Sequence, residues 1–346
     1  MDLSNVYHTT DMILNTLDFG SLFAGFHKYR FALYNSKEIY LDGKLMPYQE
    51  GFRGNTSILY DDEFIAIWNL ELDPIEDIEI LAYSLVHEMF HCHQRANKEK
   101  RYPSDLVLLN YPDDMENFLK KYNENRYLTE AYEQQDIEQF KKFVSIRNNR
   151  MNVYPDMVCQ ELRTETLEGM AEYVGLKALR SINAEKFKII TRNYVHKLRA
   201  EDSLMFDVRR ISYYSGSIYF LCLDNFGFTI KNTFDSEQTV YEQSTIDTNN
   251  IVAEVYPFGF ISSNYSEFLK EKEAKVARHI SKSKYIACNA IICGYDPMNM
   301  FRIGNIIYCS HFICLNIGGN IESINSAIAL RLADNSNQEI IGYYII

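Results

Sequence analysis

The sequence predicts an α+β fold, with a β-rich segment first, a mainly helical middle and a small antiparallel β unit at the C-terminal end. Three observations lead to this prediction. Residues 26–72 have strand-like apolar patterning, the middle of the chain repeats apolar residues at helical spacing, and apolar runs separated by turn residues return near the end. We therefore expect one domain over residues 1–281, helical over residues 73–281, and a second, β-rich domain of unassigned role over residues 282–346.

The composition of the 346-residue chain is that of a globular protein and limits its partners. Its apolar content of 47% is enough for a sizeable core, and its formal net charge of −12 argues against binding to nucleic acid or to an anionic membrane surface. No stretch approaches the roughly 18 unbroken apolar residues of a membrane span, and Asp2 stands where a secretory signal would carry positive charge. We expect a cytoplasmic protein with reduced cysteines, and the sequence leaves the oligomeric state open.

The β-rich segment contains a hairpin and a longer strand. Asp42-Gly43 separates two apolar runs, which is a strong hairpin signal. The stretch EFIAIWNLEL, residues 63–72, is rich in β-branched and aromatic residues and predicts a strand. Directly after it, the sequence predicts a helix over residues 74–97, with Asp73 as its N-cap and a proline at its first position.

Five further helices and two hairpins complete the predicted fold. A polar stretch at residues 102–115, which contains two prolines, predicts a loop. Gly318-Gly319 and the polar cluster at residues 334–337 indicate hairpins. Apolar spacing predicts helices over residues 127–147, 155–181, 184–199, 205–223 and 264–280.

A metal-binding motif lies in the first long helix. In LVHEMFHCHQ, residues 85–94, His87 and His91 are four positions apart and share one face of the helix, where both imidazoles can bind one ion. Glu88 projects about 100° away from His87, so it can reach a metal-bound water without becoming a ligand. The alternative is a helix whose histidines bind no metal. His93 lies about 200° round the helix from His91, and we expect it to have a packing or surface role.

A catalytic zinc site needs a third protein ligand and an open position for water. Residues 161–172 offer candidates, because four glutamates follow one another there at helical spacing and share one helical face. These glutamates are Glu161, Glu165, Glu168 and Glu172. A solvated acidic face is the ordinary explanation for the first two.

We prefer Glu168 to Glu165 as the third ligand. Gly169 and Ala171 follow Glu168, and such small residues would let this helix approach the histidine helix closely. Glu172, one turn further on, can accept the outward N–H of a ligand histidine and fix its tautomer. The expected site therefore holds one Zn²⁺ ion between the two histidines of the motif and Glu168.

These segments resemble the gluzincin zinc metallopeptidases. HEMFH followed at a distance by LEGMAEYVG is similar to their HExxH…E pattern, and the second segment is close to the NEG-x-A ligand segment of the M1 aminopeptidase family. ISYYSGSIYFLCLD, residues 211–224, resembles that family's SY-x-x-G helix. The resemblance implies that Tyr213 donates a hydrogen bond to the developing oxyanion, with Tyr214 as the alternative. Arg209 and Arg210, one turn earlier, can assist an oxyanion, although exposed helix charges are the commoner case.

The resemblance covers residues 60–225 and departs from the aminopeptidases in two ways. Their G-x-M-E-N segment, which anchors a free amino terminus, is absent before His87, and the only MEN sequence, at residues 115–117, lies in the expected loop. The separation of His91 from Glu168 is also far longer than in that family. The resemblance therefore implies a zincin-type catalytic core without implying aminopeptidase specificity.

The function that the sequence predicts is zinc-dependent hydrolysis of peptide bonds in a peptide or protein substrate. Glu88 would act as general base, and an extended substrate would pair with a free edge of the strand at residues 63–72. Two alternatives stay open. One is a non-catalytic zinc-binding protein that acts as a binding module through its C-terminal β domain, and the other is a structural α+β protein without a metal. The sequence does not distinguish an endopeptidase from an exopeptidase.

Overall fold

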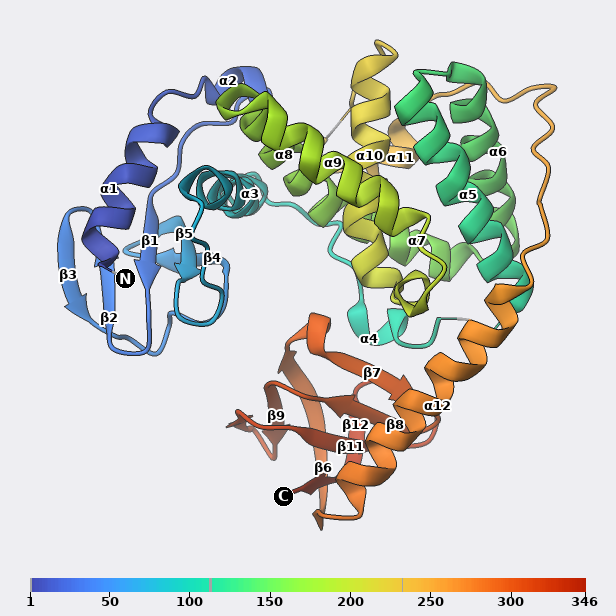
Figure 1. Ribbon diagram of the computed structural model, residues 1–346. Helices are drawn as coiled ribbons and strands as arrows, with labels where there is room; N and C mark the ends of the chain where they lie inside the picture. The colour runs from blue at the N-terminus through green and yellow to red at the C-terminus, as the bar shows by residue number, and fades with distance from the viewer. Residues whose placement is uncertain (1, 112–113, 232) are drawn as a thin grey trace.

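The computed structural model describes residues 2–111, 114–231 and 233–346, and it confirms the α+β fold. A five-stranded sheet lies at the N-terminal end, a group of helices forms the middle, and a seven-stranded sheet lies at the C-terminal end (Figure 1). The largest apolar core joins the N-terminal sheet to the helices, whereas the C-terminal sheet has a second core of its own.

The N-terminal part consists of two helices and five strands, which are α1 (Leu3–Leu14), α2 (Phe19–Leu22), β1 (Phe31–Tyr34), β2 (Glu38–Leu41), β3 (Lys44–Pro47), β4 (Thr56–Tyr60) and β5 (Glu63–Asn69). The strand order in the sheet is β3-β2-β1-β5-β4. β1 and β5 are parallel, and the other neighbours are antiparallel. Asp42 and Gly43 have φ angles of 50° and 77° in the turn between β2 and β3, so the predicted hairpin is confirmed.

The strand predicted for substrate pairing lies inside this sheet. β5 pairs with β1 on one side and with β4 on the other, so the expected free edge at residues 63–72 is wrong. Within the described residues the edge on this side is β4, which pairs with β5 alone. A run of β-branched and aromatic residues identifies a strand, but the neighbours of a strand depend on residues that are distant in the sequence.

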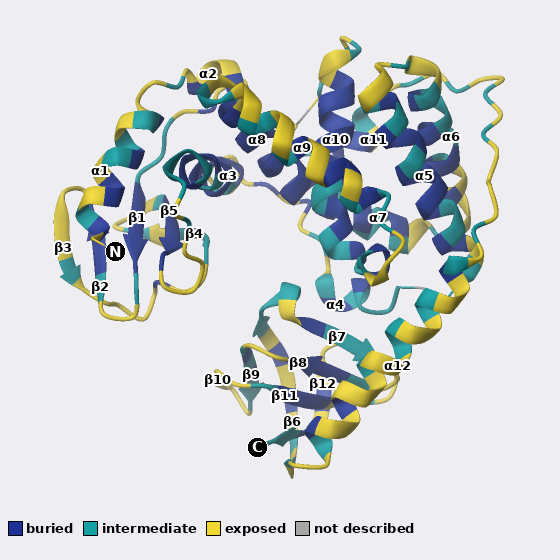
Figure 2. Cartoon of the chain, in the orientation of Figure 1, coloured by how far each residue is buried: buried dark blue, intermediate teal, exposed yellow. Residues whose placement is uncertain are grey.

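The helix that carries the HEMFH motif, α3 (Ile78–Ala96), begins later than predicted. Its N-cap is Asp77 and not Asp73. The Asp77 carboxylate accepts hydrogen bonds from the backbone N–H groups of Glu79 and Ile80 at 3.0 and 3.3 Å. α3 packs into the largest core and is buried along most of its length (Figure 2), which fixes the orientation of the side chains on it.

Helices and short helical turns form the middle of the chain, namely α4 (Asp105–Leu108), α5 (Met115–Gln134), α6 (Ile137–Val153), α7 (Pro155–Thr164), η1 (Glu165–Gly169), α8 (Met170–Ile182), α9 (Ala184–Leu198), η2 (Ser203–Phe206), α10 (Val208–Asn225) and α11 (Val240–Gln243). The helices expected over residues 184–199 and 205–223 correspond to α9 and α10. The segment expected as one helix over residues 155–181 is helical throughout, but η1 interrupts it with a π-helical turn.

The helical middle differs from the prediction at two further places. The helix expected over residues 127–147 is two helices, because Gln135 adopts a left-handed conformation with φ 53° and Asp136 caps the start of α6. The loop expected at residues 102–115 contains α4, and residues 115–117 form the first turn of α5. Apolar periodicity alone did not reveal these ends, since the caps that set them are single polar residues.

The C-terminal part consists of α12 (Phe260–Ile280), β6 (Lys284–Tyr295), η3 (Pro297–Asn299), β7 (Met300–Ile303), β8 (Ile306–Cys309), β9 (Ile313–Ile317), β10 (Asn320–Ile324), β11 (Ile328–Leu332) and β12 (Glu339–Ile345). Its sheet is antiparallel, with the order β10-β9-β6-β12-β11-β8-β7. Gly318-Gly319 connects β9 to β10, and residues 334–337 lie between β11 and β12, so both predicted hairpins are confirmed.

α12 contacts both the helical middle and the C-terminal sheet. Ile261, near its start, shares an apolar cluster with Phe118 and Phe206, whereas Val276, near its end, packs against Tyr308 and other residues of the sheet. Figure 1 shows this helix lying beside the C-terminal strands. The division of the chain after residue 281 stays a prediction.

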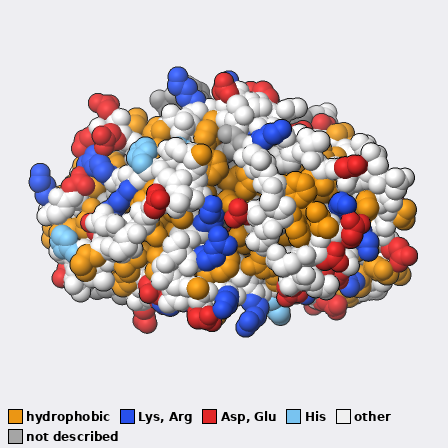
Figure 3. Space-filling model, turned by 90° about the horizontal axis from the view of Figure 1, so that it is seen from above, with side chains coloured by type: hydrophobic (Ala, Val, Ile, Leu, Met, Phe, Trp, Pro, Cys, Tyr) orange, Lys and Arg blue, Asp and Glu red, His pale blue; other side chains and the backbone are white. Residues whose placement is uncertain are grey.

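The surface of the molecule carries charges of both signs. Seen from above, Lys and Arg side chains are interspersed with Asp and Glu side chains, and apolar atoms are exposed between them (Figure 3). In the part of the chain that the structure describes, no helix has both the length and the apolar character that crossing a membrane requires.

Candidate metal centre

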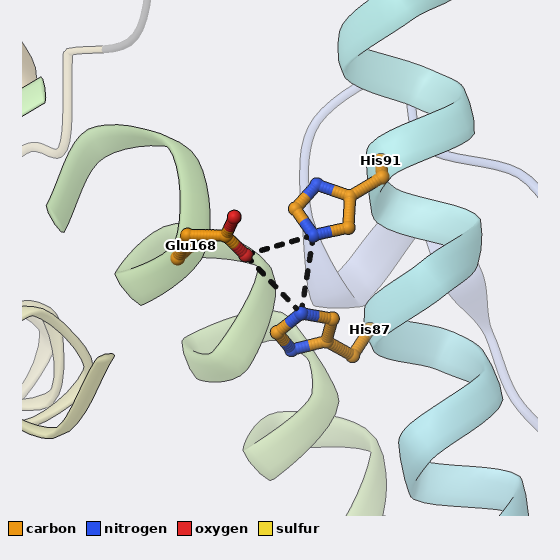
Figure 4. Close-up of side chains that lie close together, drawn as sticks. All are labelled: His87, His91 and Glu168. Atoms are coloured by element: carbon orange, nitrogen blue, oxygen red, sulfur yellow. Dashed lines mark hydrogen bonds and ion pairs between the residues drawn. The ribbon is translucent and has the colours of Figure 1, made fainter. Parts of the chain in front are cut away.

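Two helical segments bring together three side chains of kinds that can bind a metal ion. His87 and His91 project from α3 toward η1, which carries Glu168 (Figure 4). The Nε2 atom of His91 lies 3.1 Å from Nε2 of His87 and 3.1 Å from Oε2 of Glu168, and Nε2 of His87 lies 3.7 Å from the same oxygen. Among the described residues this is the group of three side chains with ligand atoms close enough to hold one ion.

The separations of these three donor atoms suit a tetrahedral zinc ion. Ligand bonds of about 2.0–2.1 Å to a tetrahedral ion hold neighbouring donors about 3.3 Å apart. The observed separations of 3.1, 3.1 and 3.7 Å bracket that value. Two histidines and one carboxylate are also the donor set of one class of catalytic zinc site, which keeps a fourth position open. The residues present therefore fit zinc.

The charges of His91 and Glu168 depend on each other. Burial opposes a charge on His91, but the Glu168 carboxylate outweighs this effect and raises the pKa of His91 to about 9. Burial likewise opposes a charge on Glu168, yet His91 and other neighbours hold the pKa of Glu168 well below its usual range. Glu168 is therefore an anionic donor at neutral pH, and His91 must release a proton when its Nε2 binds a metal.

The ligand atoms of His87, His91 and Glu168 form what we call the donor triangle. The Nδ1 atoms of both histidines are held by acceptors outside this triangle. Nδ1 of His87 lies 2.9 Å from Oε2 of Glu172, the residue that the sequence predicts for this position. Nδ1 of His91 lies 2.7 Å from Oε1 of Gln94, whose amide nitrogen donates to the Leu167 carbonyl at 2.9 Å. Such partners leave Nε2 of each ring free to bind a metal. The sequence motif did not single out Gln94, although its position three residues after His91 places it on the same helical face.

Glu172 is itself held in place by two phenols. The hydroxyls of Tyr83 and Tyr194 both donate to Oε1 of Glu172, the second at 2.5 Å. Burial raises the pKa of the Glu172 carboxyl to about 7. Three donors thus converge on one buried carboxylate, and its orientation toward His87 is fixed by side chains of α3 and α9.

The π-helical turn η1 explains how Glu168 reaches the histidines. A π-helical turn inserts one residue into an α-helix, so it rotates the following helix by about 100° relative to an uninterrupted one. Such turns are frequent at functional sites. Glu161 before η1 and Glu165 at its first position pair with cations of α5 and α6, whereas Glu168 and Glu172 face α3. The expectation that all four glutamates share one face is therefore wrong.

The expected solvated face at Glu161 and Glu165 is also wrong. Both side chains are buried, and Arg147 donates to both carboxylate oxygens of Glu165 at 2.6 and 2.7 Å. Arg150 donates to Glu161 at 2.5 Å, and Glu124 completes the network between the two arginines. Glu165 is thus neutralised by a buried arginine and lies outside the donor triangle, which favours Glu168 as the ligand.

Gly169 has a different packing role from the predicted one. A Cβ atom at this position would lie 2.7 Å from the Cα of Gly216, so the two glycines allow η1 and α10 to touch at the backbone. The close contact with α3 is made by Gly175, where a Cβ would lie 3.1 Å from the Tyr83 ring. Gly169, directly after Glu168, therefore allows the close approach of α10, the helix that carries Tyr213. It does not contribute to the close contact with the histidine helix.

Glu88 lies on α3 beside the donor triangle and is buried. Burial raises the pKa of its carboxyl, against the lowering effect of His87 and His91. A carboxyl with a raised pKa is suited to take up a proton near neutral pH. This environment is compatible with the role of general base that the sequence predicts for Glu88.

The two candidate tyrosines on α10 have different neighbours. The ring of Tyr213 is parallel to that of His87, within 5° and with ring centres 6.3 Å apart. Burial raises the pKa of Tyr213 well above its usual range, and the nearby Glu168 carboxylate raises it further, so its hydroxyl keeps its proton. Tyr214 instead accepts a hydrogen bond from Lys197 Nζ at 3.0 Å. The geometry favours Tyr213 over Tyr214 as a donor at this site.

Arg209 is not an exposed helix charge. Its side chain is 11% exposed, and its Nη2 donates to Oε1 of Glu168 at 3.1 Å, while Nη1 pairs with Asp105. It therefore contacts the oxygen of Glu168 that does not face the histidines. Arg210, by contrast, is partly exposed and pairs with Asp207 at 3.1 Å.

His93 has the packing role that its position predicts. Its ring lies against Phe23, Phe26 and Phe90 on the side of α3 away from Glu168. Burial lowers the pKa of His93 to about 4, so the ring is neutral at physiological pH.

Comparisons with known proteins do not identify a relative of this chain. No protein-family model, no curated protein sequence and no solved structure matches the chain.

Proposed function

We propose that the protein is a zinc-dependent metallopeptidase of gluzincin type. The observation that carries this proposal is the triangle of His87, His91 and Glu168, whose donor atoms lie within 4.8 Å of one another. Glu88 beside the triangle and Tyr213 against His87 add the acid–base and hydrogen-bonding groups that peptide hydrolysis needs. A zinc ion bound there would supply the Lewis acidity that activates water near neutral pH.

The residues of the chain have separate roles in this proposal. Glu88 takes a proton from the attacking water and later delivers it to the leaving amine. The hydroxyl of Tyr213 donates a hydrogen bond to the oxygen of the scissile carbonyl as negative charge develops on it. Glu172 and Gln94 fix the orientation of the two histidine rings.

An extended peptide would add to the sheet at β4 in this proposal. β4 is the edge next to β5, and it lies in contact with α3, the helix of the motif. Addition of a strand to a free sheet edge is a common way to bind a peptide backbone. The substrate is therefore a peptide or an extended segment of a protein. We further propose a cytoplasmic location, with which seven cysteines free of disulfides are compatible.

Metal content and peptidase activity test the proposal separately. The purified, untagged chain should contain about one zinc ion per molecule, and Glu168→Ala should lose it while Glu165→Ala keeps it. Glu88→Gln should retain zinc and lose activity on a peptide library by about 10²–10⁴-fold. Glu76→Gln, an exposed glutamate just before α3, is the matched control and should keep both.

The outcomes are distinct. A chain without zinc, or a Glu168→Ala variant with normal zinc, contradicts the proposed metal site. Full activity of Glu88→Gln contradicts the proposed base. A chain that holds zinc but cleaves no member of the library supports the alternative of a non-catalytic zinc-binding protein.

A further inference from the structure

A cavity of about 280 Å³ lies between the helical middle and the C-terminal sheet. Its walls come from α4, from the start of α10, from α12 and from the segment Pro297–Arg302. Figure 1 shows α4 and α12 next to the sheet on this side of the molecule. Arg209 lines the cavity and also contacts Glu168, so the cavity and the candidate metal centre share one side chain while the histidines lie outside the cavity.

Three cationic side chains line this cavity and form no close ion pair with a carboxylate in the described part of the chain. Lys272, Lys275 and Arg302 all belong to its wall, and within the described ranges no ion pair joins any of them to an aspartate or glutamate. Arg302 donates to uncharged oxygens, the Gly304 carbonyl at 2.7 Å and the Asn337 side chain at 3.0 Å. The charges of these cations are therefore available to a ligand.

The acidic side chains in the wall are already engaged. Asp105 pairs with Arg209, and Asp207 accepts from Arg210 at 3.1 Å. The cavity thus carries uncompensated positive charge, although the formal net charge of the chain is −12. Burial lowers the pKa of Lys272 to about 8, against the raising effect of the nearby Asp207 carboxylate, and a bound anion would stabilise this charge further.

The rest of the wall is mostly apolar and includes several aromatic side chains. Phe206 contacts Phe268 with ring centres 5.3 Å apart and Tyr265 with ring centres 5.1 Å apart. The Nζ atom of Lys272 lies 3.8 Å from the centre of the Phe268 ring, so cationic and aromatic surfaces adjoin. A ligand that fills such a cavity needs an anionic group and an aromatic or apolar body.

We propose that this cavity binds a small organic anion with an aromatic body. Its carboxylate or phosphate group pairs with Lys272, Lys275 and Arg302, and its ring packs against Phe206 and Phe268. None of these five residues belongs to the donor triangle or to its hydrogen-bond partners, although Arg209 in the cavity wall also contacts Glu168.

Calorimetric titration of the full chain tests this site with two anions and one neutral analogue. 3-Phenylpropanoate and phenyl phosphate present the two head groups on similar bodies, and 3-phenylpropanamide lacks the charge. At least one anion should bind saturably, and the amide should bind about tenfold more weakly or not at all, since hydrogen bonds to charged groups contribute more to affinity than neutral ones. The anion that binds more tightly identifies the head group.

Variants locate the binding. Lys272→Met and Arg302→Gln should each weaken binding of the preferred anion about tenfold. Lys270→Met, on the exposed side of the same helix, is the matched control and should leave the affinity unchanged. Binding should persist in His87→Ala, which excludes capture of the anion by a metal at the donor triangle. A thermal melt of each variant reports whether it is folded.

The proposal is overturned by any of four results. These are no saturable binding of either anion, equal binding of the amide, an equal loss of affinity in Lys270→Met, and loss of binding in a folded His87→Ala variant. The last result would assign the anion to the donor triangle. None of the four results tests whether the chain hydrolyses peptides.

Discussion

Nδ1 of His87 lies 2.9 Å from Oε2 of Glu172, a carboxylate that also accepts hydrogen bonds from Tyr83 and Tyr194. The contact joins the middle of α3 to the start of α8, which lie 85 residues apart in the sequence. It fixes the Nδ1 edge of the histidine ring and leaves Nε2 directed at Glu168. The geometry of the donor triangle therefore depends on residues that lie outside the triangle.

Replacing Glu172 by leucine should weaken zinc binding about 10–100-fold, because His87 would lose the acceptor that orients its ring. Competition with a chelator of known affinity measures this change. Tyr194→Phe is the control, since it removes a donor to Glu172 but leaves the contact with His87, and its effect should be much smaller. Equal zinc affinity of Glu172→Leu and the unaltered chain would show that this hydrogen bond does not position the ligand.

In the proposed mechanism the hydroxyl of Tyr213 contributes only when the oxyanion develops, so replacing Tyr213 by phenylalanine should lower kcat about 10²–10³-fold and leave zinc content unchanged. Steady-state kinetics on a cleaved peptide, with metal analysis of the same sample, measure both. Tyr214→Phe removes a hydroxyl that contacts Lys197 and should retain most of the activity. The reverse ranking of the two variants would transfer the role of donor to Tyr214.

Replacing Gly216 by alanine should lower the free energy of unfolding by about 1–3 kcal/mol. The new Cβ would lie 2.9 Å from the Cα of Gly169 and 3.1 Å from the Cα of Glu165, both backbone atoms of η1, so α10 and η1 must move apart. Zinc affinity should fall as well, because Glu168 lies in the same turn. Urea unfolding and chelator competition measure the two effects. Gly259→Ala, whose Cβ would meet nothing within 4 Å, should change neither.

The stability of the chain should fall in acid partly through Glu161. Burial opposes its ionisation, but Arg150 and Lys121 outweigh burial and lower the pKa of Glu161 to about 2. An unfolded glutamate has a pKa of about 4.3, so the folded state binds fewer protons between these values. The stabilisation from Glu161 is therefore complete above about pH 5 and is lost as the pH falls toward 2.

Thermal unfolding at several pH values measures this dependence. Glu161→Gln should be less stable than the unaltered chain by about 3–5 kcal/mol at pH 7, because it leaves buried cations uncompensated. Its melting temperature should then fall less steeply than that of the unaltered chain between pH 5 and pH 3. Parallel curves for the two proteins would show that another carboxyl accounts for the acid sensitivity.

Much of the fold follows from local patterns in the sequence. Asp42-Gly43 and Gly318-Gly319 occur at hairpins because these residue pairs tolerate the positive φ angles of tight turns. The limits of helices were less accurate, as Asp77 and Gln135 show, because one polar residue decides where a helix starts or ends. The position of β5 inside its sheet was not predictable, since its neighbours β1 and β4 are chosen by tertiary packing.

The sequence by itself determined which residues are candidate ligands. The spacing of His87 and His91 places them on one face of a helix, and that relationship needs no tertiary information. Only the tertiary structure decided between Glu165 and Glu168. On an uninterrupted helix these glutamates share a face, and the single extra residue of η1 turns Glu165 toward Arg147 and Glu168 toward the histidines. That extra residue is accommodated by backbone packing of η1 against Gly216, a long-range contact that no local pattern reveals.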